Sequence, residues 1–176
     1  LFKNTEFVGY SDLNKKPGFQ MGMHRTKDGR YYLYTACFRD NGFNIVDVTD
    51  PAKPVAKWVE GDWVGEVHDG QSLAKLQVAD GKLIACYGGT MRVLHGTHEQ
   101  PYWGGFKIYD IETDPLNPKL LGQFECEDGP GVHRSFYNGG DYAYIMGSKR
   151  NFRGYILRIV DISDPSSPTE VGSWWA

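Results

Sequence analysis

Three histidines are the residues in this sequence best suited to chemistry. His24, His68 and His133 each precede a glycine-containing turn and a second apolar run, and they are three of the five histidines. Imidazole is the commonest protein ligand for Zn, Cu, Fe and Ni, and a cluster of imidazoles favours such a metal over Ca or Mg. If the three converge, the metal activates water or dioxygen or polarises a carbonyl. The histidines therefore predict a transition-metal cofactor, Zn, Cu or Fe, in an enzyme acting on a small-molecule substrate.

Three charged residues beside these histidines are the predicted catalytic groups. Glu66 lies two residues before His68, on the same strand face, where it would act as a ligand, as a general base or as the acceptor of an imidazole N–H. Arg25 and Arg134 directly follow the other two histidines and would bind a carboxylate or another anion. The alternatives stay open: Glu66 as a solvated carboxylate, and the two arginines as partners of acidic residues in a neighbouring unit.

Two further histidines, His95 and His98, lie in an insertion at residues 90–103. Long loops in compact domains are often functional, so this one either adds metal ligands or covers the mouth of the site. Gly96 and Pro101 favour an irregular loop over a helical turn. The roles of both histidines stay open.

The elements that would position these residues follow from a phrase that occurs three times. The copies run over residues 45–51, 108–115 and 159–165, and each is an alternating strand that enters an Asp-Pro turn. A second proline, three residues after the first, begins another apolar strand. A mid-strand aspartate recurs in each copy, at Asp47, Asp110 and Asp161. We expect these aspartates to accept hydrogen bonds from turn amides.

Each unit contains four expected strands: one before a glycine turn, one after it, the strand of the phrase, and the strand after the second proline. The Asp-Pro aspartates, at positions 50, 114 and 164, are 64 and 50 residues apart, close to the roughly 40 to 50 residues of a propeller blade plus one insertion. The predicted fold class is all-β, with three four-stranded blades of a larger, seven-bladed β-propeller. The expected parts of this single partial domain, residues 1–176, are an outer strand at about 1–12 and blades at about 20–60, 64–125 and 130–176.

The first residues of the chain resemble its last strand. Residues 6–10 match residues 170–174, so the chain is expected to begin and end on an outer strand. Three blades cannot close a ring, because closed propellers use about four to eight. The remaining blades would come from missing chain or from another copy, and the start without Met indicates an excerpt.

The phrases at residues 44–51 and 158–165 resemble the LVIVD repeat, in which a strand of this kind enters an Asp-Pro turn and an LVGSY-type strand follows. The resemblance covers nearly the whole chain and implies a propeller. It supplies no function for the three histidines, which stand where ordinary repeats carry a small or apolar residue.

Composition excludes several classes. A net charge of −3 and a pI of about 5.9 leave no basic field for nucleic acid. No segment approaches the roughly 20 apolar residues of a membrane span. Three cysteines without a CxxC spacing indicate buried free thiols. The compartment stays open, although the resemblance and the strands rich in Tyr and Trp favour a periplasmic or secreted setting.

Two other functions remain open. A non-catalytic scaffold would bind proteins or glycans through its loops. The histidines would then be polar lining of the central channel, on the propeller axis where the enzyme hypothesis places the metal ion. A metal-free lyase or isomerase would use His and Glu as acid and base. Nucleotide-binding and serine-hydrolase motifs are absent from the sequence.

Overall fold

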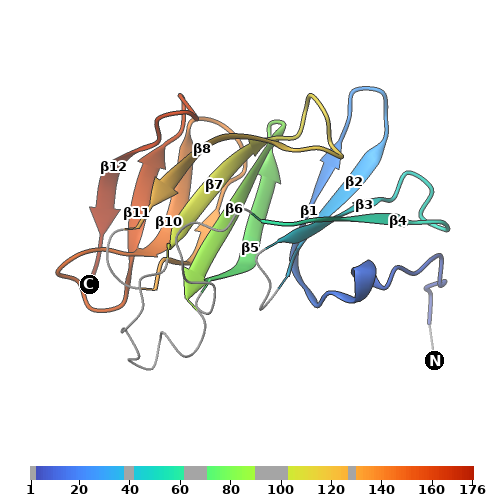
Figure 1. The fold of residues 1–176 in the computed structure, drawn as a ribbon, viewed down its shortest axis with the longest axis horizontal. Coiled ribbons are helices and arrows are strands. Elements are labelled where there is room, and N and C mark those ends of the chain that lie inside the picture. The colour runs from blue at the N-terminus through green and yellow to red at the C-terminus, as the bar shows by residue number, and fades with distance from the viewer. Residues whose placement is uncertain (1–2, 38–41, 62–70, 90–102, 127–129) are drawn as a thin grey trace.

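The computed structural model describes residues 3–37, 42–61, 71–89, 103–126 and 130–176, and apart from one short 3-10 turn its regular elements are strands (Figure 1). In chain order the elements are η1 (Leu13–Lys15), β1 (Gly18–Arg25), β2 (Tyr31–Cys37), β3 (Phe43–Asp47), β4 (Val55–Val59), β5 (Gln71–Ala79), β6 (Lys82–Gly89), β7 (Gly105–Asp110), β8 (Lys119–Glu125), β9 (Val132–Phe136), β10 (Tyr142–Ser148), β11 (Tyr155–Asp161) and β12 (Thr169–Trp174). In this part of the chain, no helix has the length and apolar character that crossing a membrane requires.

The strands form three antiparallel units of four, each paired in chain order. We name them sheet 1 (β1–β4), sheet 2 (β5–β8) and sheet 3 (β9–β12). A single residue pair, Cys37 with Leu73, joins sheets 1 and 2 into one hydrogen-bonded network. The all-β prediction with four-stranded units is confirmed. The sheets lie side by side in a row (Figure 1), and the described residues do not form a closed ring.

Two apolar layers hold the row together. One lies between sheets 1 and 2 and includes Tyr34, Phe43 and Tyr87, and the other lies between sheets 2 and 3 and includes Ile84 and Phe106. Because side chains alternate along a strand, a sheet with a neighbour on each side needs apolar residues at every position. This explains the continuous apolar run in β6, where residues 83–87 are all buried.

The repeated turns match the expectation from the phrase. Asp47 Oδ1 accepts a hydrogen bond from the Thr49 amide at 2.9 Å, and the equivalent bond from Ser163 to Asp161 is 2.8 Å long. Asp110 makes the same contact with the amide of Glu112, at 2.9 Å. The structural role predicted for the three aspartates is confirmed. The three cysteines are buried, also as expected.

A buried polar residue recurs three positions before each of these aspartates. Asn44, Lys107 and Arg158 are 0%, 1% and 5% exposed. Each is satisfied differently, because the surroundings of the three sheets differ. Asn44 donates to the Leu13 carbonyl of the segment that covers sheet 1, at 2.9 Å, Lys107 lies over aromatic rings, and Arg158 forms an ion pair with Glu170.

Candidate functional site

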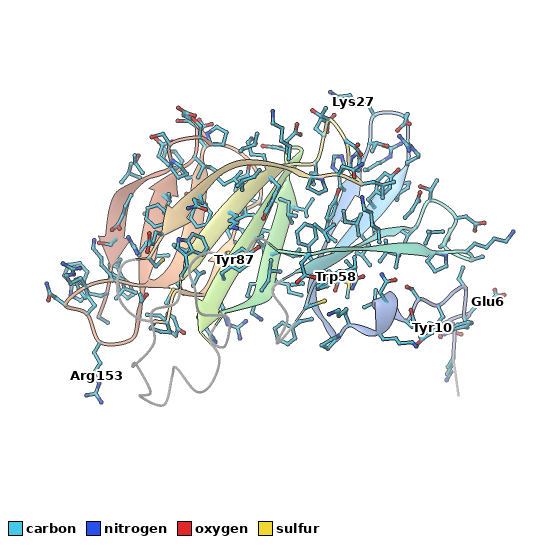
Figure 2. The ribbon with its side chains drawn as sticks, in the orientation of Figure 1. Glu6, Tyr10, Lys27, Trp58, Tyr87 and Arg153 are labelled. Atoms are coloured by element: carbon cyan, nitrogen blue, oxygen red, sulfur yellow. The ribbon has the colours of Figure 1, made fainter. Side chains whose placement is uncertain are left out.

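His24 lies at the turn end of β1, buried between sheets 1 and 2, with 6% exposure. Its Nε2 is 3.6 Å from Glu112 Oε2, whose other oxygen is 2.9 Å from Lys27 Nζ. Figure 2 shows Lys27 at the tip of the turn between β1 and β2. Burial lowers the pKa of His24, opposed in part by the charges of Glu112 and Asp110. The histidine therefore belongs to a contact between two sheets.

His133 lies in a different place from His24. It is exposed, and its ring stacks on that of Tyr155, with centroids 5.1 Å apart. His24 pairs with Tyr32, which in turn pairs with the mid-strand Asp47. The equivalent of Tyr32 in sheet 3 is Tyr142, because Tyr142 pairs with the mid-strand Asp161. His133 instead lies next to Arg134, which pairs with Met146. Met146 is four residues after Tyr142 in β10. Four residues of strand correspond to about 13 Å, so the two imidazoles do not occupy one level.

The predicted metal-dependent enzyme is therefore wrong. Within the described ranges, no three His, Cys, Asp or Glu side chains gather in a group that could hold a metal ion. The offset between His24 and His133 gives the physical reason. Four residues of the hypothesis, His68, Glu66, His95 and His98, fall outside the described residues.

The two arginines of the predicted anion site are also separated along the strands. Arg25 pairs with Tyr31 beside the turn, and its guanidinium lies 5.7 Å from the centre of that ring. Arg134 pairs with Met146 at the other end of its sheet. The two arginines therefore lie at different levels of their strands, and the anion site predicted for them stays a prediction.

The first strands of the three sheets, which we call the inner strands, share a feature that the histidines do not mark. In each of β1, β5 and β9 the pairing shifts by one residue, so that two residues oppose one. In each sheet the single residue that opposes the bulge lies on the second strand. It pairs on its other side with the residue four positions before the mid-strand aspartate, so the three bulges are equivalent. They are Phe19-Gln20 against Ala36, Ala74-Lys75 against Cys86, and His133-Arg134 against Met146. Bulges re-aim side chains and are common next to functional sites.

The bulges bring cationic and aromatic side chains together on the inner strands. Lys75 Nζ lies 3.9 Å from the centre of the Phe19 ring. Burial, and then the charge of Arg134, lowers the pKa of Lys75, and burial followed by the charges of Arg134 and Lys75 lowers the pKa of His133. We call Phe19, Gln20, Lys75, His133 and Arg134 the bulge surface. It can attract an anion and pack against an apolar group.

Comparison with protein families gives one result. The model of the LVIVD repeat matches residues 31–59 and 138–175, which cover β2–β4 of sheet 1 and β10–β12 of sheet 3. Two segments of the chain therefore match the LVIVD repeat. The resemblance predicted from the sequence is confirmed for these two segments. Neither the curated proteins nor the solved structures gave a significant match.

The sequence held a signal for the bulge surface, although its residues lie outside the two matched segments. Lys75 lies six residues before Gly81, and Arg134 lies six residues before Gly140. Counting back from the turn glycine therefore aligns the two cations. The histidines precede their turns by unequal distances, which indicates that they are not equivalent.

The burial of His24 between sheets 1 and 2 predicts a loss of stability in acid. Its pKa in the folded protein lies below the ordinary value of 6.5, so the unfolded chain takes up the proton first. The free energy of unfolding therefore does not depend on His24 well above about pH 6.5, where the imidazole is neutral in both states, and it decreases as the pH falls through this value. In urea denaturation, the free energy of unfolding of the native chain should fall more steeply between pH 7 and 5 than that of the His24→Gln variant. Equal slopes would show that His24 does not titrate in this way.

Proposed function

We propose that this chain is three consecutive blades of a seven-bladed LVIVD-repeat propeller, which acts as a non-catalytic binding scaffold. The observation that carries the binding role is the bulge surface, where three equivalent distortions of the inner strands present two cations and an aromatic ring. Its ligand would carry a carboxylate or another anionic group next to an apolar part. The blade boundaries expected from the sequence are kept as part of this proposal.

The open face of sheet 3 supports the propeller. Tyr142, Tyr144 and Met146 are 45%, 37% and 38% exposed. Their equivalents in sheet 1, Tyr32, Tyr34 and Ala36, are at most 1% exposed, because sheet 2 covers them. A face of this composition has the chemistry of an interface between two sheets, and large exposed apolar faces are rare on complete domains. A fourth sheet that packs here would continue the row.

The charges of the bulge surface support binding rather than chemistry. No ion pair joins Lys75 or Arg134 to a carboxylate of the described residues. Two neighbouring cations therefore lie on the inner strands, and their repulsion would be relieved by an anion. Arg134 offers a planar fork for a carboxylate, and Lys75 adds a point charge.

Citrate is a suitable probe, because its carboxylates can engage both cations. We expect Lys75→Gln and Arg134→Gln each to weaken citrate binding by roughly tenfold, since each removes one charge-assisted contact worth about 1.5 kcal/mol. Isothermal titration calorimetry on the folded variants measures the change.

Arg153→Gln is the matched control for this titration. Arg153 is exposed, and Figure 2 shows it pointing away from the sheets at the edge of the molecule. Removing its charge should leave citrate affinity unchanged within about twofold, because exposed charges act weakly over such separations. Equal weakening by all three variants would mean that citrate responds to net charge alone, and the binding site would be disproved.

A further inference from the structure

The segment before β1 makes a contact that is repeated between the sheets. Gly9 lies directly on the carbonyl of Pro51, in the Asp-Pro turn of sheet 1, so closely that a β-carbon would overlap the oxygen. The next atoms that this β-carbon would meet are the carbonyl carbon of Pro51 and Cα of Ala52, both at 3.1 Å. Only glycine permits such an approach of two backbones.

The same contact joins sheet 2 to sheet 3. Gly122 of β8 lies on the carbonyl of Pro165 in the Asp-Pro turn of sheet 3, where a β-carbon would also overlap the oxygen. The next atoms are the carbonyl carbon of Pro165 at 3.0 Å and Cα of Ser166 at 3.1 Å. The fourth strand of sheet 2, which we call its outermost strand, therefore packs against the Asp-Pro turn of sheet 3.

The fourth strand of sheet 1 contacts sheet 2 at the repeat position of Gly122. Gly122 pairs with Ile108, and the equivalent pair in sheet 1 is Lys57 with Ile45. Lys57 Nζ donates to the Leu116 carbonyl at 2.8 Å, in the Asp-Pro turn of sheet 2. The contact of Gly9 with Pro51 is thus the contact that an outermost strand makes with the next sheet.

Residues 5–10 nevertheless belong to no strand of the described structure. Phe7, Val8 and Tyr10 are 66%, 56% and 75% exposed. Figure 2 shows Glu6 and Tyr10 at the edge of the molecule, beyond β4. The segment occupies the place of an outermost strand, but the three strands that would accompany it are missing from the described residues.

We propose that residues 5–10 are the fourth strand of an additional sheet, whose first three strands are of the LVIVD type and lack an outermost strand of their own. The contact also fixes the register: Gly9 corresponds to Gly122 and Gly172, one residue away from the alignment expected from the sequence. A second copy of this chain does not fit this role, because β4, β8 and β12 already complete its described sheets. The inference rests on the propeller part of the proposed function, but it is independent of anion binding, because backbone contacts carry it.

The test supplies the missing strands in the same polypeptide. A duplicate of residues 130–168, which contain β9–β11 and the following turn, replaces residues 1–5 and is joined directly to Glu6. This junction places Gly9 four residues after the duplicated Pro168, as Gly172 is in sheet 3. We expect the amides of Phe7, Val8 and Tyr10 to exchange at least about a hundredfold more slowly than in the unmodified chain, because they enter a sheet.

The matched control carries Gly-Ser-Gly-Ser-Gly in place of residues 6–10. Protection of the duplicated third strand should appear in the fusion and be lost in this control. Unchanged exchange at residues 7–10 in a folded fusion would overturn the proposal.

A second measurement covers a fusion that does not fold. In the unmodified chain, Gly9→Val should release residues 5–10 and raise the exchange rates of their slowest amides, and an unchanged pattern would overturn the assignment. A concentration-dependent dimer of the unmodified chain that Gly172→Val abolishes would also overturn it, in favour of pairing between copies.

Discussion

Arg158→Ala is expected to lower the free energy of unfolding by about 3 kcal/mol, measured by urea denaturation at pH 7. Arg158 is 5% exposed, and its Nη2 lies 2.6 Å from Glu170 Oε2. Nη1 donates to the Ser148 carbonyl at 2.7 Å, and the guanidinium lies 4.8 Å from the centre of the Phe124 ring. Alanine removes all three contacts and leaves a largely buried carboxylate with one cation fewer, which explains the size of the loss.

Two controls separate the charge from the packing. The double variant with Arg158→Met and Glu170→Leu should recover at least half of the loss, because it removes the buried guanidinium and the carboxylate together. It separates only Lys149 from its carboxylate partner, and that side chain is 35% exposed. Arg153→Ala, at an exposed position, should change stability by less than about 0.5 kcal/mol. If the double variant is no more stable than Arg158→Ala, the ion pair is not the source of the stability.

Gly122→Ala is expected to lower the free energy of unfolding by about 1 to 3 kcal/mol, while Gly172→Ala leaves it unchanged within about 0.5 kcal/mol. The two glycines occupy the same repeat position, since each pairs with the isoleucine two residues before the mid-strand aspartate. At Gly122 a β-carbon overlaps the Pro165 carbonyl, which is backbone and cannot rotate away. At Gly172 the nearest atom would be Ile159 Cδ1, at 3.5 Å, which is ordinary contact.

Urea unfolding of the two variants side by side makes this comparison. Equal losses would assign the cost to the strand itself, and the seat on the Asp-Pro turn would then contribute nothing. No loss in either variant would show that the two sheets can separate without cost.

The fold could be predicted from the sequence because the information is local and repeated. An alternating strand that enters an Asp-Pro turn with a second proline specifies a strand, a turn and another strand, whatever surrounds them. The hydrogen bonds of Asp47 and Asp161 to turn amides follow from the same local chemistry. The burial of Asn44, Lys107 and Arg158 could not be predicted, because each is satisfied by a different neighbour.

The candidate site could not be predicted because it depends on register. The turn after β1 runs from Thr26 to Arg30, where the Thr26 amide donates to the Arg30 carbonyl, whereas a two-residue turn, Asp80-Gly81, joins β5 to β6. Turns of different length, together with a bulge in each inner strand, shift residues that look equivalent by count. His24 and His133 are separated in this way, while Lys75 and Arg134 are aligned.

The measurement that tests the scaffold most directly is a citrate titration of the isotope-labelled chain followed by amide NMR. We expect shifts centred on Gln20, Lys75 and Arg134, which the bulges place at one level of the inner strands. The exposed loop around Arg153 should not respond. Shifts confined to other parts of the chain would contradict the proposed binding site. The absence of shifts at about 20 mM citrate would also contradict it, because a Kd of that size corresponds to a binding free energy of only roughly −2.3 kcal/mol.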